Sequence, residues 1–339
     1  MAVTLHEVAF LAGVSIKTVS NVINGYPHIR PATRDRVEAA VAELGYTPNL
    51  TARNLRGGRS GAITLALPDM GLAYFAELAA QVIEAAEAAG MIVQLEHTAG
   101  DRERELELLK SPRRKASDGL IFSALGMSQD DADALDVPYP LVLLGERIFG
   151  GPADHVTMRN EDAARAATEY LIASGRRRIA IIGAHEGEVV GSAGLRLAGY
   201  KEALERAGIG MDPQLVGYTG LWHRANGAET MRALLASGVE FDAAFCLNDT
   251  LAFGAMRVLQ EVGLSVPGDV AVMGFDDIEE ARYSIPSLTT VHPGQDWIAR
   301  TAVETLMGRI AAQGKGPWAA AMTRLANFEI VPRESAPQH

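Results

Sequence analysis

The stretch that most constrains this chain lies near its start, at residues 13–25, where a glycine separates two short amphipathic segments. In the first segment, Thr4 and Glu7 have the spacing of a capping box, in which each side chain bonds the backbone N–H of the other. Gly13 can adopt the left-handed conformation that ends a helix, and Ser15 can cap the next one. The sequence therefore predicts two helices joined by a tight glycine turn.

The second of these helices has a buried stripe and an outward face. Val19, Val22 and Ile23 recur at positions i, i+3 and i+4, as in a helix packed on one side. The side chains left on the other face are those of Ile16, Lys17, Thr18, Ser20 and Asn21. This arrangement is typical of a helix-turn-helix, whose second helix enters the DNA major groove. An ordinary helical hairpin has the same pattern, so these residues alone leave both interpretations open.

Two more helices are expected before residue 60. Pro31 fits the first position of a helix, residues 37–44 carry apolar side chains at helical spacing, and Gly45 can end it. Residues 49–58 can form two helical turns between Asn49 and a pair of glycines. Because so short a helix is unstable in water, it would need a partner helix or DNA to order it.

Charge is divided unevenly along the chain, whose formal net charge is −11. Residues 1–59 carry seven basic and four acidic side chains, a net charge of +3, whereas the remainder carries 24 basic and 38 acidic ones, a net charge of −14. A basic head on an acidic body is expected when only the head meets phosphates.

Length and composition narrow the class of protein. A chain of 339 residues with 48% hydrophobic side chains is expected to form two or three domains with large cores. Apolar runs such as residues 63–67 are far too short to span a bilayer, and no signal-peptide pattern precedes the first helix, so we expect a cytoplasmic protein without a membrane partner. The single cysteine, Cys246, excludes an intrachain disulfide and a CxxC metal site, and its apolar neighbours favour a packed core thiol.

After residue 61, apolar strand-like runs alternate with amphipathic helices. This pattern predicts parallel sheets covered by helices on both faces, and residues 62–339 exceed one such unit, so we expect two doubly wound α/β lobes with a cleft between them. The expected strands are residues 62–67, 91–95, 119–122, 141–144, 155–158, 178–182, 214–218, 243–247, 270–274, 289–291 and 325–331. The expected helices are residues 74–89, 103–109, 129–135, 194–207, 225–237, 251–262 and 297–312.

The expected domains follow from this order of elements. We predict a helix-turn-helix domain at residues 1–47, a hinge helix and linker at 48–60, and a core at 61–339. The first lobe of the core comprises about 61–160 and 292–322, and the second about 161–291 and 323–332. Crossovers between the lobes would form a hinge. Ligands of open α/β sheets bind beyond the carboxyl ends of the strands, so the residues after each strand are candidates for a site.

Three segments give the chain a resemblance to the LacI/GalR family of bacterial transcription regulators. The first contains Val8-Ala9, Gly13-Val14-Ser15, Thr18-Val19-Ser20 and Asn24-Gly25, and the second Leu44-Gly45-Tyr46-Thr47-Pro48-Asn49, Ala52-Arg53 and Leu55. The third contains Asn248-Asp249, Ala252-Phe253-Gly254-Ala255, Pro267, Asp269-Val270, Gly274-Phe275-Asp276-Asp277, Pro286 and Leu288-Thr289-Thr290-Val291. The resemblance covers essentially the whole chain. It implies an N-terminal helix-turn-helix, a hinge helix and a periplasmic-binding-protein-like core that dimerises, and it favours the helix-turn-helix over the plain hairpin.

The resemblance also implies a set of DNA contacts. Phosphates would be bound by Ser15, Thr18, Ser20 and Asn24, with Thr4 and Thr33 near two helix N-termini. Base edges would be read by Ile16, Lys17 and Asn21. Many relatives have arginine at the last of these positions, so the operator sequence does not follow. Leu55 matches the leucine that relatives insert into the minor groove, flanked by Tyr46, Asn49, Ala52 and Arg53. Packing of Leu55 against the core is the alternative.

For the cleft, the resemblance points to a small-molecule effector, expected to be a carbohydrate. The implied contacts are Arg196, Trp222, Asn248 and Asp276 from the second lobe, and Asp69, Tyr74, Phe75 and Glu146 from the first. Arginine, amide and carboxylate groups together offer the donors and acceptors that a polyol needs. Leu72-Ala73 replaces the Asn-Pro common in the family, so the effector's identity does not follow. Trp222 could instead fill the core, and Asp249 and Asp277 could simply cap helices.

These features predict an effector-responsive DNA-binding regulator, most simply a repressor. It would bind pseudo-palindromic double-stranded operator DNA as a homodimer, under allosteric control by the small molecule. No leucine-heptad tail follows Val331, which favours a dimer over a tetramer. The chain has no P-loop, no GxGxxG after a strand and no His/Cys cluster with metal spacing, so we expect no cofactor, no metal and no enzymatic activity. A solute receptor would share the two-lobed core, but the basic head and the lack of a signal peptide argue against it.

Overall fold

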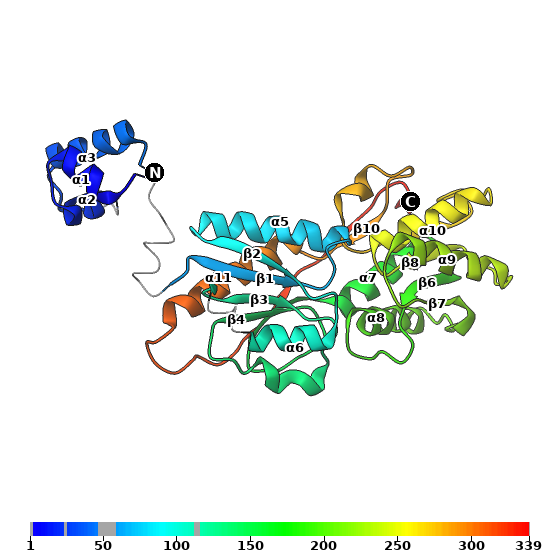
Figure 1. The fold of residues 1–339 in the computed structure, drawn as a ribbon. Coiled ribbons are helices and arrows are strands. Elements are labelled where there is room, and N and C mark those ends of the chain that lie inside the picture. The colour runs from blue at the N-terminus through cyan, green and yellow to red at the C-terminus, as the bar shows by residue number, and fades with distance from the viewer. Residues whose placement is uncertain (1–2, 24–25, 47–58, 112–115, 339) are drawn as a thin grey trace. The chain divides into compact units, whose positions relative to one another are not determined.

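The computed structural model describes residues 3–23, 26–46, 59–111 and 116–338. The chain forms two compact units, Met1–Gly61 and Ala62–His339, which we call the head and the core (Figure 1). The hinge helix expected at residues 49–58 lies outside the described residues. Within them, no helix combines the length and hydrophobicity that crossing a membrane requires.

The described residues of the head form three helices, α1 (Leu5–Ala12), α2 (Ile16–Ile23) and α3 (Pro31–Leu44). The predicted capping box begins α1: the N–H and hydroxyl of Thr4 donate to the Glu7 carboxylate at 2.7 and 2.9 Å, and the Thr4 hydroxyl accepts from the Glu7 N–H. Gly13 and Gly45 end α1 and α3 with φ values of 64° and 63°. The predicted limits of these helices are thus confirmed.

A small apolar cluster holds the three helices together. Its buried members are Val8, Ala9 and Ala12 of α1, Val19 and Val22 of α2, and Val37 and Ala40 of α3. Ile23 packs against this cluster, as its spacing predicts, but so does Ile16. Ile16 was expected on the outward face, and its partial burial shows that one side of this residue belongs to the core of the head.

The first lobe of the core is built on one parallel sheet with the strand order β11-β5-β4-β3-β1-β2. Its strands are β1 (Ala62–Leu67), β2 (Ile92–His97), β3 (Leu120–Ser123), β4 (Leu141–Leu144), β5 (Asp154–Met158) and β11 (Thr323–Ala326). Its helices are α5 (Ala73–Ala88), α6 (Arg102–Lys110), α11 (Gln295–Ala312) and the 3-10 helix η2 (Gln129–Leu135). Figure 1 shows α5 and α11 on one face of this sheet and α6 on the other.

Successive side chains of the buried strands point to opposite faces of the sheet and belong to two separate apolar cores, as a doubly wound sheet requires. Leu65, Ile121 and Val142 belong to the cluster that contains the buried side chains of α5 and α11. Phe122 and Leu143 belong to a second cluster with α6 and η2.

The second lobe repeats this plan on a four-stranded parallel sheet with the order β7-β6-β8-β9. Its strands are β6 (Ile179–Ala184), β7 (Val216–Tyr218), β8 (Ala243–Cys246) and β9 (Ala271–Met273). Its helices are α7 (Asn160–Ala173), α8 (Ser192–Arg206), α9 (Arg224–Ala236), α10 (Asp249–Glu261) and the 3-10 helices η3 (Pro213–Leu215) and η4 (Glu279–Arg282). Cys246 is fully buried, and burial raises the pKa of its thiol, as expected for a core residue.

The chain crosses between the lobes three times. It enters the second lobe between β5 and α7, returns through β10 (Thr290–His292) to α11, and leaves the first lobe again through β12 (Glu329–Val331). β10 and β12 pair antiparallel beside each other. One continuous apolar cluster includes Leu65 of the first sheet, Phe245 of the second, and Met158 and Val291 at the crossovers.

The structure corrects the placement of the last predicted strand. Residues 325–331 were expected to form one strand of the second lobe, with residues 323–332 assigned there. Instead, β11 pairs in parallel with β5 in the first sheet, and only β12, farther on, lies at the crossover. The reason is that the chain leaving α11 is held at the start of β5, where the Met322 N–H and the Arg309 guanidinium donate to the Asp154 carboxylate at 2.9 and 2.6 Å.

Three smaller differences concern the type or limits of elements. Helix α7 was not among the predicted helices, although Ala163, Ala164, Ala167 and Leu171 give it a buried stripe at helical spacing. Residues 129–135 form a 3-10 helix rather than an α-helix. The strand expected at residues 214–218 is shorter, because Pro213 starts a 3-10 turn that Asp212 caps.

The close packing of α9 against α10 in the second lobe depends on glycine, and this gives a stability prediction. A Cβ on Gly254 of α10 would overlap the carbonyl oxygen of Arg224 in α9. Gly254→Ala should therefore destabilise the core by about 1–3 kcal/mol, the usual cost of overpacking. Urea denaturation of the full chain measures this effect.

Gly308, within α11, provides the matched control. A Cβ there would meet nothing within 4 Å, so Gly308→Ala should leave stability unchanged or raise it by about 0.4–1 kcal/mol. Equal effects of the two substitutions would show that the α9–α10 contact does not require glycine.

Candidate functional site

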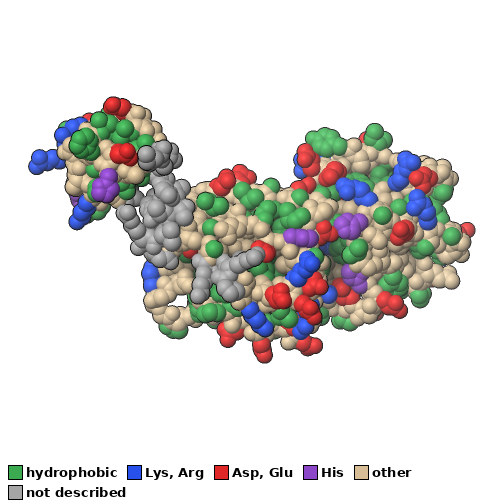
Figure 2. Space-filling model, viewed as in Figure 1, with side chains coloured by type: hydrophobic (Ala, Val, Ile, Leu, Met, Phe, Trp, Pro, Cys, Tyr) green, Lys and Arg blue, Asp and Glu red, His purple; other side chains and the backbone are tan. Residues whose placement is uncertain are grey.

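The outward face of α2 presents polar side chains from a capped helix. The Ser15 hydroxyl accepts from the Thr18 N–H at 3.1 Å and shares a hydrogen bond with the Thr18 hydroxyl at 2.9 Å. Lys17 is exposed, and Ser20 and Asn21 are partly exposed. Figure 2 shows Lys and Arg side chains on the visible face of the head. The first two turns of α2 thus carry the donors expected at a phosphate-binding and base-reading surface.

Only some of the other predicted DNA contacts lie within the described residues. Thr4 is exposed at the start of α1, Thr33 is partly buried in the first turn of α3, and Tyr46 packs against the apolar cluster of the head. Asn24, Asn49, Ala52, Arg53 and Leu55 lie outside the described residues. Their roles therefore stay predictions.

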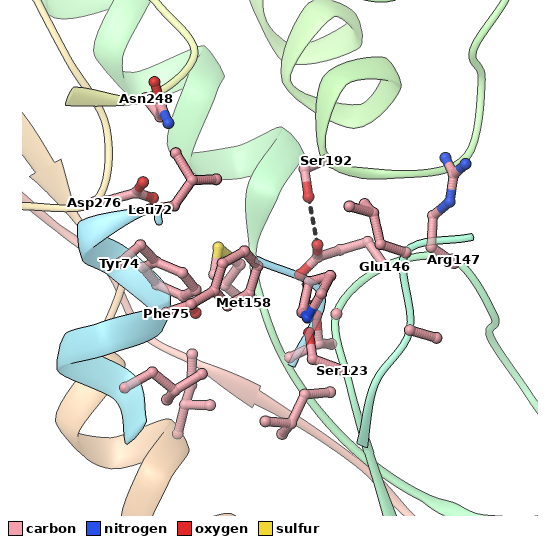
Figure 3. Close-up of a pocket in the computed structure, with 18 of the residues that line it drawn as sticks. Leu72, Tyr74, Phe75, Ser123, Glu146, Arg147, Met158, Ser192, Asn248 and Asp276 are labelled. Carbon is pink, nitrogen blue, oxygen red and sulfur yellow. Dashed lines mark hydrogen bonds between the residues drawn. The ribbon is translucent and has the colours of Figure 1, made fainter. Parts of the chain in front are cut away.

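A cavity in the core lies at the carboxyl ends of the strands of both sheets. Seven of the eight predicted effector contacts line it: Tyr74, Phe75, Glu146, Arg196, Trp222, Asn248 and Asp276. In Figure 3, Asp276 and Asn248 lie on one side of the cavity, and Glu146 and Ser192 lie on the other. The cavity thus lies where the rule for open α/β sheets places ligands, beyond the strand ends.

Arg196, in the second turn of α8, is a fully buried cation with many partners. Its guanidinium donates to the Asn160 side chain at 2.7 Å, to the carbonyl of Leu247, and to the Met158 sulfur at 3.4 Å. Its Cζ atom lies 3.5 Å from the centre of the Phe275 ring. Burial lowers the pKa of this guanidinium, and nearby carboxylates oppose that shift.

Glu146, which follows β4, joins the two lobes inside the cavity. It is only 6% exposed, and its two carboxylate oxygens accept from the Thr157 hydroxyl at 2.8 Å and from the Ser192 hydroxyl at 2.5 Å (Figure 3). Thr157 belongs to the first lobe and Ser192 begins α8 in the second. A ligand that competes for this carboxylate would therefore alter a direct link between the lobes.

Asp276, which follows β9, has a buried carboxyl group on the side of the cavity opposite Glu146. It lies 3.8 Å from the guanidinium of Arg196. Burial raises the pKa of Asp276 to about 7; Arg196 works against this shift, whereas Glu146 and Glu77 add to it. Its backbone has a φ of 116°, which is strained for a residue with a Cβ.

Asn248 and Trp222 are held by each other and by the backbone. The Asn248 carbonyl oxygen accepts from the Leu251 N–H at 2.7 Å and so caps α10, and its amide donates to the Trp222 carbonyl at 3.1 Å. The Trp222 indole donates to the Gly183 carbonyl at 2.8 Å. Asp249 does not cap α10, and no helix begins at Asp277, so the capping interpretation of these two residues is wrong.

Asp69 is the predicted contact that does not line the cavity. Its carboxylate accepts from the Gly71 N–H at 2.7 Å and lies 3.0 Å from the imidazole of His223 in the second lobe. A second bridge between the lobes runs from Arg147 to Glu188 at 2.9 Å, and Glu188 also bonds His185. Asp69 is thus engaged by His223 across the two lobes and does not line the cavity.

Several lining residues were not predicted from the sequence. They include Leu72, Ser123, Thr157, Met158 and Ser192. Ser123 ends β3, and Thr157 and Met158 end β5, so the rule of strand ends could have found them. Ser192 had no such signal, because it begins a helix after a loop.

The chain was next compared with known proteins. Residues 4–49 match the model for bacterial regulatory proteins of the lacI family, and residues 168–336 match that for a periplasmic binding protein-like domain. The ribose operon repressor of Escherichia coli K12 is 34% identical over 309 residues, covering 91% of this chain and 93% of that protein. The chain belongs to the LacI family of bacterial regulatory proteins.

Solved structures of LacI-family proteins agree with this assignment. The lac repressor dimer bound to operator and an anti-inducer is 30% identical, with a TM-score of 0.82 and full coverage of both chains. A complex of the transcriptional regulator CelR with cellobiose is 32% identical, with a TM-score of 0.71 and coverage of 98% of this chain and 99% of that one. The predicted fold class is confirmed, and this LacI-family chain is a regulator of the repressor type rather than an enzyme.

The raised pKa of Asp276 predicts how stability depends on pH. The unfolded carboxyl ionises near 3.8 and the folded one near 7, so between these values the folded state binds more protons. This group should therefore make the free energy of unfolding fall as pH rises from 4 to 7. Asp276→Asn should remove that contribution. The free energy of unfolding of the variant should therefore increase relative to that of the wild type as pH rises.

Thermal denaturation of the ligand-free chain across this range measures the effect, with Asp133→Asn, at an exposed carboxyl on η2, as the control. A difference between Asp276→Asn and wild type that does not change with pH would contradict the prediction.

Proposed function

We propose that this LacI-family chain is a repressor that binds pseudo-palindromic operator DNA as a homodimer and responds to a small sugar bound between the lobes of its core. The observation that carries the proposal is the cavity, in which side chains from both lobes converge on one space. A repressor must be in the same compartment as the DNA that it binds. The proposal therefore includes the cytoplasmic location expected from the sequence.

The DNA-binding part of the proposal rests on the head. Lys17 and Asn21 on α2 would read base edges, while Ser15, Thr18 and Ser20 would bind phosphates. The lac repressor, solved on its operator, supports this docking mode. Leu55 would enter the minor groove at the centre of the operator, at a cost of a few kcal/mol of unstacking that the bent DNA offsets.

The effector part rests on the size and chemistry of the cavity. The space open to the centres of water molecules is about 90 Å³. A cavity of this kind, lined by side chains from both lobes, suits a small molecule rather than a macromolecule. Arg196 can donate to hydroxyl groups, Glu146 and Asp276 can accept from them, and Trp222 and Phe75 offer ring faces for stacking. The relative solved with cellobiose supports a carbohydrate ligand.

The homodimer rests on apolar surface that the core leaves uncovered. β2 is the edge of the first sheet, and its Ile92 and Leu95 are 60% and 47% exposed. In the second lobe, Tyr283 and Ile285 are 76% and 85% exposed. Exposed edges of this kind favour pairing with another chain, and the lac repressor was solved as a dimer.

Allosteric control would use the crossovers and the bridges between the lobes. A sugar bound to Glu146 would compete with Ser192, and one bound to Asp276 would act close to β10. Either contact shifts the balance between lobe arrangements by its differential binding energy, typically about 1–3 kcal/mol. A short hinge helix needs little more than this to form or melt.

A mobility-shift assay tests the DNA-binding part of the proposal. The full chain should bind DNA from upstream of its own gene, and affinity should fall steeply as salt rises, because phosphate contacts release counterions. Leu55→Ala should weaken this specific binding by roughly tenfold or more, while sugar binding stays intact.

The lack of salt-sensitive binding to that region and to any genomic fragment would refute the proposal. Full operator affinity in Leu55→Ala would refute only the minor-groove role of Leu55.

A thermal-shift screen of monosaccharides and disaccharides tests the effector part. A sugar that binds the folded chain should raise its denaturation temperature, and Trp222→Ala should abolish that rise by losing the stacking surface. Trp318→Ala is the matched control, because Trp318 lies over Arg309 and outside the cavity. A rise that persists in Trp222→Ala would place the sugar elsewhere.

A further inference from the structure

The loop that carries Asp276 into the cavity is strained. It follows β9, and two successive non-glycine residues in it, Asp276 and Asp277, have positive φ values of 116° and 52°. Such conformations persist only where surrounding contacts hold them. The question is therefore which contacts fix this loop.

Beside backbone bonds from the crossover segment and an ion pair between Arg333 and Asp277, Asp249 at the first turn of α10 supplies two of these contacts. Its backbone N–H donates to the carbonyl of Phe275 at 2.8 Å, and its carboxylate accepts from the Ile278 N–H at 3.0 Å. These two bonds clamp the loop on both sides of Asp276 and Asp277. The side chain of Asp249 is fully buried.

The same carboxylate reaches a segment that connects the lobes. Its other oxygen accepts from the hydroxyl of Thr290 at 2.5 Å, and Thr290 is a fully buried residue of β10. One side chain therefore ties together the start of α10, the loop of Asp276 and a crossover strand.

The surrounding sequence is adapted to this contact. A Cβ at position 274 would overlap the carboxylate of Asp249, so only Gly274 leaves room for it. The backbone of the loop also bonds the crossover segment, since the N–H of Gly274 donates to Thr289 and that of Asp276 to Val291, both at 2.9 Å.

We propose that Asp249 is a positioning residue, which holds Asp276 in the cavity and, through Thr290, couples the Asp276 loop to the crossover strand β10. This inference rests on the proposed effector site, because it assigns Asp249 a role toward a ligand that Asp249 does not touch. The ligand would contact Asp276, and Asp249 would determine where that carboxyl lies.

Thr290 offers a sharper test than Asp249, whose removal from the core could prevent folding. Thr290→Val keeps the shape of the side chain and removes only the hydroxyl, whereas Thr290→Ser keeps the hydroxyl. Asp249→Asn is the conservative variant at the other end: its amide can donate to Thr290 while its oxygen still accepts from the Ile278 N–H.

Hydrogen exchange of the full, ligand-free chain gives a measurement that needs no sugar. In Thr290→Val, the peptide spanning residues 274–279 should exchange roughly tenfold faster or more, because the clamp has lost one buried hydrogen bond. Thr290→Ser and Asp249→Asn should exchange like the wild type. Wild-type exchange of this peptide in Thr290→Val would overturn the proposal, as would equal acceleration throughout the second lobe.

Titration with D-ribose adds a second arm. If the wild type binds D-ribose, Thr290→Val should weaken binding by roughly tenfold and Thr290→Ser should not, since one misplaced polar contact costs about that much. Undiminished affinity in Thr290→Val would overturn the positioning role. Failure of the wild type to bind D-ribose would count against that sugar as effector, and hydrogen exchange alone would then decide the inference.

Discussion

The core depends on one buried positive charge, the guanidinium of Arg196. Taking such a group out of water is costly unless its hydrogen bonds and countercharge are supplied by the protein. Its partners here come from the first crossover, from the end of β8 and from the loop after β9, with an aromatic ring against its face. The need to solvate this cation therefore brings together the strand ends that form the cavity.

Much of the head and of the cavity could be predicted because the deciding signals are local. The capping box of Thr4 and Glu7 and the glycine at position 13 each act over a few residues, and the structure reproduces them. Asn248 and Asp276 follow apolar strands, and parallel strands carry such residues to one edge of a sheet. Arg196 needed the family resemblance, since nothing in its neighbours marks it as buried.

The features that escaped prediction depend on partners distant in sequence. The pairing of β11 with β5 has no local signal, because the four residues Thr323–Ala326, of which only the last is buried, do not specify one sheet over the other. Asp69 follows a strand as a site residue should, yet an imidazole from the other lobe captures its carboxylate. The role of Asp249 is likewise set by Thr290 and Ile278, which only the folded chain brings to it.

The apolar cluster shared by the two lobes affects how the chain can be divided. Its members include side chains of both sheets and of the crossovers, so a cut between the lobes would expose apolar surface on each side. The lobes are thus halves of one folding unit, and separate fragments of them would be poor objects for biophysical study. The junction near residue 61, by contrast, separates two units with cores of their own. A recombination event at this junction would exchange one head for another without cutting through either core.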